Sequence, residues 1–161
     1  MAEQLAVRAM SETASETAIA FIDAYQAHDL ERMVSLCADD AGFHYVPYEI
    51  EGRQRVVRGN GKAHGIGKTF WASMIDAFPD LSCDVGSVIS DDQGNVAMEV
   101  VVEGTQARVF GPFGSLGGHF DLPHLFIFKV NDAGLNKDLS AYWDTAHWYE
   151  QLGHHGQVLD Q

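Results

Sequence analysis

The second half of the sequence alternates between apolar and polar residues over four consecutive segments, and this pattern most narrows the folds open to the chain. The segments cover residues 81–90, 95–105, 120–130 and 135–144. Two polar turns containing glycine, Asp91-Asp-Gln-Gly94 and Asn131-Asp-Ala-Gly134, join them in pairs and are typical of β-hairpins. Five glycines or prolines within residues 110–118 predict a loop between the pairs. We therefore expect four antiparallel strands.

The first half of the sequence carries a helical period instead. Thr13-Ala-Ser-Glu16 matches a capping box and predicts the start of a helix. Asp29 predicts the cap of a second, short helix, and a short strand is expected over residues 43–48. A third helix carries Trp71 and Met74 on its apolar stripe and stops before Pro79. Helices must cover one face of the sheet, so the order predicts an α+β layer fold.

Charge excludes two classes of partner. The chain of 161 residues is long enough for one core and carries 23 acidic against 10 basic residues, a net charge of −13. DNA and anionic membrane surfaces attract basic patches. The nearest approach to such a patch is interrupted by glycines and consists of Arg53, Arg55, Arg58, Lys62 and Lys68. We expect neither nucleic acid nor a membrane as a partner.

The N-terminal residues and the cysteines bear on the compartment. No apolar run approaches the about 20 residues that cross a bilayer. Residues 1–17 contain acids and lack the apolar core of a secretory signal. Cys37 and Cys83 lie in apolar segments and require no disulfide, which fits a reducing compartment. A cytoplasmic protein is expected.

Four stretches of the sequence together resemble one family. They are Phe21–Leu30 running into Cys37–Ala41, Trp71–Leu81, Glu103-Gly-Thr105, and Tyr142-Trp-Asp144 followed by Gln151-Leu-Gly153. In this order they are similar to the SnoaL-like polyketide cyclases of the nuclear-transport-factor-two-like superfamily. The resemblance covers nearly the whole chain, but this fold hosts many reactions, so it says less about chemistry.

The resemblance implies a definite architecture. It is a cone-like α+β roll, with three helices packed on a curved antiparallel sheet that encloses one pocket. One domain is expected over residues 1–161, with residues 1–12 as a loose lead-in and 154–161 as a tail. Members of the superfamily pair through the outer sheet face, so a homodimer is expected.

At several positions where related enzymes carry catalytic residues, this sequence has other residues, and this reduces the number of reactions to be expected. Where the related ketosteroid isomerases carry an aspartate base, a tyrosine and an acid, this sequence has Tyr45, Phe21 and Phe126. Isomerisation by that mechanism is therefore not expected. The Asp–Arg–Asp set of the limonene epoxide hydrolases is also absent. Many SnoaL-like cyclases carry a histidine after the Gly-Thr pair, and here that position is Gln106.

His124 is the strongest candidate for chemistry. Strand alternation puts it on one face with four apolar residues: Phe120, Leu122, Phe126 and Phe128. Such neighbours desolvate the imidazole, which disfavours its charged form and keeps it available as a proton acceptor. The resemblance places His124 on the pocket face, two residues from the acid of the isomerases. A core histidine bonded to a backbone carbonyl is the alternative.

Two further residues complete the predicted catalytic group. Asp144, at the end of the last strand, is expected to orient His124, although an aspartate there also caps the following turn. Tyr45 is expected to hold the oxygen that gains charge, because a phenol with a pKa of about 10 is a good donor and a poor base. An ordinary half-buried strand tyrosine is its alternative. His44 alternates to the opposite face and is a secondary candidate.

Aromatic residues and the absence of cofactor motifs shape the remaining expectations. The expected substrate-pocket residues are His44, Trp71, Met74, Gln106, Phe113, Phe126 and Trp143, with plain core packing as the alternative for the apolar ones. No histidine pair has zinc-ligand spacing, and a metal held by His124, Asp144 and either His44 or His119 is the one arrangement that remains conceivable. Gly61, Gly65 and Gly67 form no phosphate-binding motif. We expect neither metal nor cofactor.

These features lead to one hypothesis and one rival. The first is a cofactor-independent acid–base enzyme that acts on a small apolar, aromatic or polyketide-like molecule by aldol-type cyclisation, retro-aldol lysis or dehydration. The second is a non-catalytic module that binds a small ligand or assembles as a dimer. Access of His124 to a cavity distinguishes the two.

Overall fold

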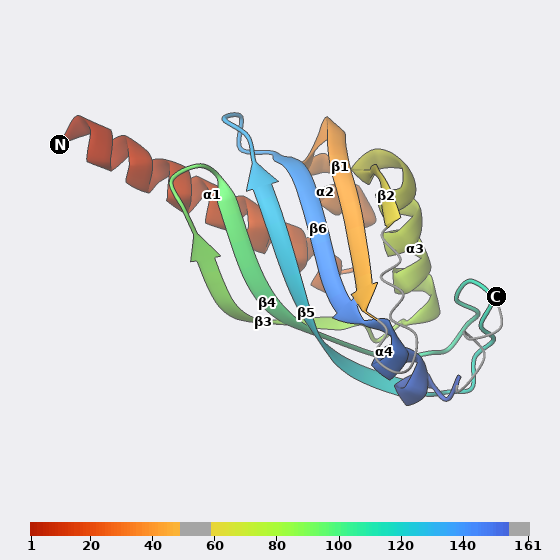
Figure 1. Ribbon diagram of the computed structural model, residues 1–161. Coiled ribbons are helices and arrows are strands. Elements are labelled where there is room, and N and C mark those ends of the chain that lie inside the picture. Colours follow the sequence, from red (N-terminus) through yellow and green to blue (C-terminus); the bar gives the residue numbers. More distant parts are fainter. Residues whose placement is uncertain (49–58, 155–161) are drawn as a thin grey trace.

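The computed structural model describes residues 1–48 and 59–154 of the chain (Figure 1). In chain order the elements are α1 (Ala2–Gln26), α2 (Leu30–Ser35), β1 (Cys37–Tyr48), β2 (Gly59–Lys62), a π-helical turn η1 (Ala63–Gly67), α3 (Lys68–Ala77), β3 (Ser82–Ser90), β4 (Asn95–Thr105), β5 (His119–Val130), β6 (Asn136–Asp144) and α4 (Thr145–Leu152). Three residues of the interrupted basic stretch lie outside the described residues: Arg53, Arg55 and Arg58.

The strands form one curved sheet in the order β2-β1-β6-β5-β4-β3. The two predicted hairpins are confirmed, since β3 pairs antiparallel with β4 and β5 with β6. The expectation of a wholly antiparallel sheet is wrong at one place, because β1 pairs parallel with β6. The chain between these two strands includes α3 and four other strands, which is ample for the crossover that a parallel pair needs.

Helix α1 begins much earlier than the capping pattern indicates. It runs from Ala2, so Thr13 lies inside the helix and the expected start there is wrong. Residues 1–12 are helical from Ala2 onward rather than a loose lead-in, because they are mostly strong helix formers such as Ala, Glu, Gln and Leu. The Thr17 hydroxyl bonds the carbonyls of Thr13 and Gly134 and so ties the helix to the β5–β6 turn.

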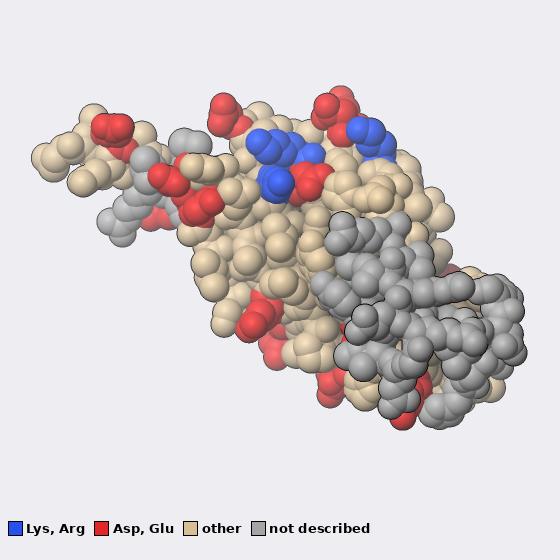
Figure 2. All heavy atoms as spheres, in the orientation of Figure 1, with Lys and Arg blue, Asp and Glu red and all other residues tan. Residues whose placement is uncertain are grey.

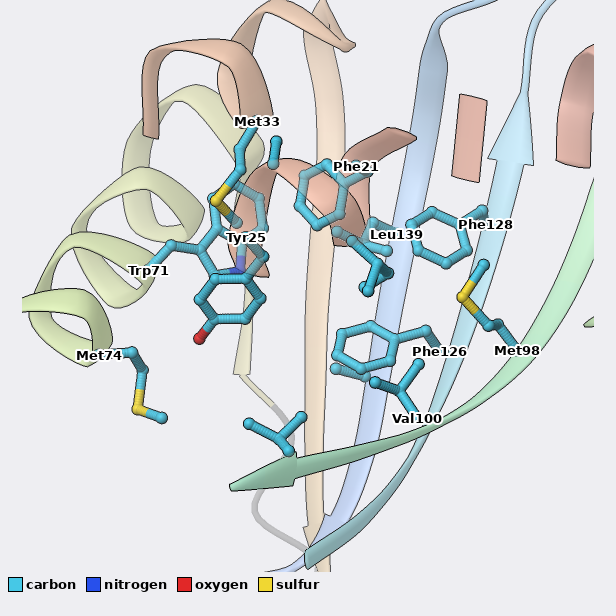
Figure 3. Close-up of a cluster of buried hydrophobic side chains, with 14 of the residues drawn as sticks. Phe21, Tyr25, Met33, Trp71, Met74, Met98, Val100, Phe126, Phe128 and Leu139 are labelled. Carbon is cyan, nitrogen blue, oxygen red and sulfur yellow. The ribbon is translucent and has the colours of Figure 1, made fainter. Parts of the chain in front are cut away.

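The core lies between the sheet and the helices that cover its inner face (Figures 1 and 3). Alternate residues of β4 and β5 are buried on this face, as the strand pattern predicts. Phe21 of α1 makes edge contacts with Trp71 of α3 at 5.1 Å and Phe128 of β5 at 5.8 Å between ring centroids. Aromatic packing therefore fixes both long helices against the same strip of sheet.

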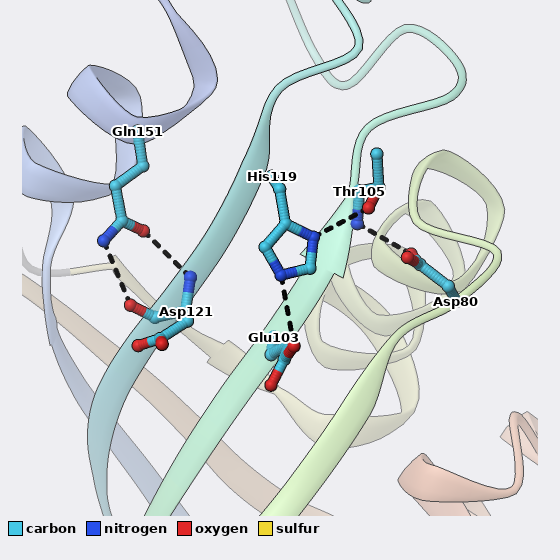
Figure 4. Close-up of polar contacts among 6 residues, drawn as sticks. All are labelled: Asp80, Glu103, Thr105, His119, Asp121 and Gln151. Carbon is cyan, nitrogen blue, oxygen red and sulfur yellow. Dashed lines mark hydrogen bonds and ion pairs between the residues drawn. The ribbon is translucent and has the colours of Figure 1, made fainter.

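The chain after β6 forms an element that the sequence analysis did not anticipate. Asp144 caps α4 by accepting a hydrogen bond from the His147 N–H at 3.0 Å, and Gly153 ends the helix in the left-handed conformation. The Gln151 amide exchanges two hydrogen bonds with the main chain of Asp121, which holds α4 against β5 (Figure 4). His154, expected in a polar tail, is only 3% exposed.

The surface carries charge unevenly. On the face that Figure 2 presents, basic side chains gather along the upper edge, with acidic ones beside them, and further acidic side chains lie mostly along the other edges. Within residues 1–48 and 59–154, no helix is both long enough and apolar enough to span a membrane.

Candidate active site

An apolar cavity lies between the inner face of the sheet and helices α1, α3 and α4. Its walls are mostly aromatic and comprise Tyr25, Phe43, Phe70, Trp71, Met74, Val102, Phe120, His124, Phe126, Ala141, Trp143 and Trp148. Four of the residues expected at a substrate pocket line this cavity: Trp71, Met74, Phe126 and Trp143. The cavity volume is about 20 Å³, room for about one water molecule, so a larger ligand requires the walls to separate.

His124 lines this cavity from β5. Its ring stacks with Phe126 and with Trp143, at centroid distances of 5.7 and 5.6 Å. Its Nδ1 lies 3.0 Å from the Leu122 carbonyl oxygen, which can only accept, so Nδ1 carries the proton and Nε2 carries a lone pair. Desolvation by the surrounding side chains lowers the pKa of His124 to about 4. The imidazole is therefore neutral at physiological pH, and its Nε2 lone pair is free.

Asp144 does not orient His124 as expected. Its carboxylate caps α4 through the His147 N–H, while Nδ1 of His124 is bonded to Leu122. Alternation explains the outcome, because Trp143 is buried on the inner face and its neighbour Asp144 turns to the other side of β6. The capping alternative for Asp144 is the observed one. Asp144 and His124 both border a groove of about 640 Å³ on the outer face of the sheet.

The tyrosine that lines the cavity is Tyr25 and not the expected Tyr45. Tyr45 is half-buried and stacks on Phe70 and Trp143, at 6.0 and 6.1 Å, behind the residues that line the cavity. Tyr25 of α1 lines the cavity directly and is 3% exposed. Figure 3 shows its hydroxyl directed toward Met74. Burial raises the pKa of Tyr25 well above its ordinary value, so this hydroxyl is a donor and not an anion.

Sequence reasoning missed Tyr25, although a signal for it exists. It is the polar-tipped member of the helical stripe that also contains Ala18, Phe21 and Ile22, all three fully buried. A hydroxyl on such a stripe must find a partner in the core or face a cavity.

Gln106 and Phe113 belong to a different cluster, which corrects their expected place in the pocket. Gln106 is 1% exposed and donates to the carbonyls of Arg108 and Phe113. Its Oε1 accepts from Nε2 of His154, at 3.1 Å. Phe113 packs on His154 at 4.9 Å. These contacts fix the loop after β4 to the end of α4. The side chains of Gln106 and Phe113 therefore do not line the cavity.

The histidines on the outer face are tied to surface partners. His119 of β5 contacts the Thr105 hydroxyl at 2.7 Å and the Glu103 carboxylate at 3.1 Å, and Asp80 accepts from the Thr105 N–H (Figure 4). His119 and Glu103 are each about half exposed. Among the described residues, no group of three or more His, Cys, Asp or Glu side chains is placed to hold a metal ion.

His44 joins three strands on the outer face rather than lining the pocket. Its Nδ1 lies 2.6 Å from Oδ1 of Asn60 on β2, and its Nε2 lies 2.7 Å from Oδ1 of Asp138 on β6. Two oxygen acceptors facing the two ring nitrogens favour the protonated form of the ring. The bond to Asn60 and then the contact with Asp138 raise the pKa of His44, although partial burial opposes them.

We expect this contact to stabilise the fold at acid but not alkaline pH. The raised folded-state pKa means that its contribution is fully present below about pH 6.5 and is lost as the pH rises through the folded pKa. The ring is about a third exposed, so the effect is on the surface-pair scale of about 0.2–1 kcal/mol. Urea unfolding of wild type and His44→Gln at pH 5.5 and 8.5 measures it. The same pH dependence in both proteins would contradict the assignment.

Comparison with known proteins agrees with this architecture. The model of the SnoaL-like domain family matches residues 18–136. A candidate polyketide cyclase from Xanthomonas campestris pv. campestris has a similar structure, with a TM-score of 0.70, 22% identity, and 89% of this chain and 98% of that one covered. IdmH of Streptomyces antibioticus, also a candidate polyketide cyclase, gives a TM-score of 0.68 at 24% identity, covering 87% and 98%.

A third structure with this fold has a different assigned chemistry. AclR of Streptomyces galilaeus, a candidate hydroxylase, gives a TM-score of 0.71 at 16% identity, covering 89% of this chain and 87% of that one. No protein of curated function matches the sequence. The family match extends over well more than half of the chain, and the chain belongs to the SnoaL-like domain family.

Proposed function

We propose that the protein is an acid–base enzyme that acts without a cofactor on a small apolar, aromatic or polyketide-like molecule. The observation that carries the proposal is His124, a neutral histidine whose Nε2 lone pair belongs to a ring lining an aromatic cavity. Aromatic walls suit an aromatic ligand, and the relatives described as candidate polyketide cyclases make this ligand class a natural starting point.

The chemistry begins with transfer of a proton from carbon to nitrogen. Nε2 of His124 takes a proton from a carbon next to a carbonyl group, and the electron pair moves to the carbonyl oxygen. The Tyr25 hydroxyl, a buried donor in the same cavity, stabilises that oxygen in the role first expected of Tyr45. Aldol cyclisation, retro-aldol lysis and dehydration all use such an enolate. Asp144 acts indirectly, by holding the start of α4.

Carbon-bound proton exchange tests this proposal without knowledge of the natural substrate. Acetophenone in D₂O with the protein should exchange its methyl protons for deuterium faster than with the same concentration of free imidazole, as followed by proton NMR. The protein unfolded in urea is the matched control, because it keeps every side chain and loses the cavity. Equal exchange with folded and unfolded protein would remove the support for an enzyme.

One observation favours a binding module as the second candidate. The Nδ1–H group of His124 donates a hydrogen bond to a main-chain carbonyl, and the cavity holds about one water molecule. A module of this kind binds acetophenone without accelerating exchange, so the same experiment with a binding measurement separates the two functions.

We also propose that the protein is a homodimer that pairs through the outer sheet face. This face holds the groove of about 640 Å³, and Leu125 there is 38% exposed. Asp84 and Glu99 also border the groove, so two copies meet with like charges and salt should strengthen the pairing. Sedimentation at low and high salt measures this, and a monomer under both conditions would contradict it.

A further inference from the structure

Two tryptophans in the cavity wall have indole N–H groups without partners. Trp143 of β6 is 6% exposed and Trp148 of α4 is 4% exposed, and both line the cavity beside His124. Neither Nε1 atom has a hydrogen-bond partner among the described residues. An indole N–H can only donate, and a buried donor without an acceptor is costly enough to require an explanation.

The side chains of the cavity wall provide few hydrogen-bond acceptors for these two indole N–H groups. Apart from His124 and Tyr25, the side chains around them are hydrocarbon or indole rings, methionine and small aliphatic groups, which are poor acceptors. The Trp143 ring lies nearly parallel to that of His124, at 19°. An indole N–H lies in the plane of its ring, so this stacking directs it alongside the imidazole and not at Nε2. Residues 1–48 and 59–154 thus supply no acceptor for these two donors, and an oxygen atom of a ligand would supply one.

We propose that Trp143 and Trp148 donate their indole N–H groups to a carbonyl oxygen of the ligand, so that the cavity selects aryl ketones over aromatic hydrocarbons of the same size. The inference rests on the proposed function and adds the two oxygen-binding residues to it. When Nε2 of His124 takes the carbon-bound proton, the electron pair passes to this oxygen, and donors placed there bind the enolate more tightly than the ketone. Return of the proton restores both partners.

The size of the cavity decides how the proposal is tested. A ligand larger than water must separate the walls of the cavity. Acetophenone and ethylbenzene have nearly the same shape, so both bear the same cost of opening. The ratio of their affinities therefore isolates the contribution of the carbonyl oxygen.

The experiment measures binding of this pair to wild type, Trp143→Phe and Trp148→Phe by saturation-transfer NMR titration. Each variant keeps an aromatic ring and removes one N–H. We expect each to lose about three- to tenfold in affinity for acetophenone, the effect of one hydrogen bond, and to change by less than twofold for ethylbenzene. An unchanged acetophenone-to-ethylbenzene ratio in both folded variants would overturn the proposal.

A second measurement needs only the wild-type protein. The carbonyl stretch of ¹³C-labelled acetophenone moves to lower frequency when the oxygen accepts hydrogen bonds. A bound frequency equal to that in a hydrocarbon solvent would also overturn the proposal, even if both variants failed to fold. His124→Phe should keep the preference for acetophenone, because it leaves both indole N–H groups in place. If the wild-type protein prefers acetophenone but fails to accelerate proton exchange, the result counts against the enzyme and not against the two donors.

Discussion

His124→Phe should slow the protein-catalysed exchange of acetophenone protons by about 10²–10⁴-fold, the contribution typical of a general base. Phenylalanine preserves the ring that stacks with Phe126 and Trp143 and removes only the nitrogens. His119→Ala, on the exposed face of the same strand, is the matched control and should stay within about twofold. Exchange within about threefold of wild type in His124→Phe would show that another group moves the proton.

The pH dependence of the wild-type protein, compared with that of His124→Phe, provides an independent check. Desolvation lowers the pKa of His124 to about 4, so exchange should be level above about pH 5 and decline near pH 4. Below an unfolded-state pKa of about 6.5, the unfolded chain binds a proton that the folded chain refuses. Stability attributable to His124 therefore falls as the pH drops from about 6.5 to 4, by up to about 1.4 kcal/mol per unit. His124→Phe should remove this acid sensitivity.

Trp71→Ala should lower the free energy of unfolding by about 3–5 kcal/mol, as removal of a large core side chain does. Trp71 is 1% exposed and its ring contacts Phe21 at 5.1 Å and Phe43 at 5.0 Å, so its loss affects α1, α3 and β1 together. A domain is stable by only about 5–15 kcal/mol, so the variant should be close to unfolding at elevated temperature.

Urea unfolding monitored by circular dichroism measures this loss. Leu116→Ala is the matched control, since Leu116 is 67% exposed and its truncation should change stability by less than about 0.5 kcal/mol. A loss below about 1 kcal/mol in Trp71→Ala would mean that α3 is not packed as the structure shows.

The strands of the two hairpins, β3 to β6, could be predicted because each carries one strong local signal, whereas β2 carries none and was not predicted. In β5 the buried face is apolar except for His124, and a turn with glycine follows, so period and boundary agree. Pairing between distant segments has no comparable signal. The parallel contact of β1 with β6 depends on how the whole chain closes, and nothing in residues 37–48 alone distinguishes it from an antiparallel edge.

The helix ends show how local signals compete. Asp29 predicts its helix correctly and accepts from the Arg32 N–H at 3.0 Å. Thr13-Ala-Ser-Glu16 has the same kind of signal, but the residues before it favour helix as strongly as those after it, so the cap is not used. A capping pattern therefore marks a boundary only where the preceding residues cannot extend the helix.

The candidate site was predictable where it depends on one strand and unpredictable where it depends on several elements. His124 follows from alternation within β5. Tyr25 and Trp148 meet it from α1 and α4, across distances that no spacing in the sequence encodes. Asp144 was available both to cap a helix and to orient an imidazole, and the nearer partner, the His147 N–H three residues away, is the one it binds.

Helix α4 lies beyond the part of the chain that the family model matches. That match ends at residue 136, whereas Trp143 and Trp148 come after it. The Gln151 amide pair and the buried His154 hold this end of the chain to the rest of the molecule, and neither contact uses the Trp148 ring that lines the cavity. Grafting residues 145–154 from one family member to another should therefore change ligand preference and leave the six-stranded sheet intact.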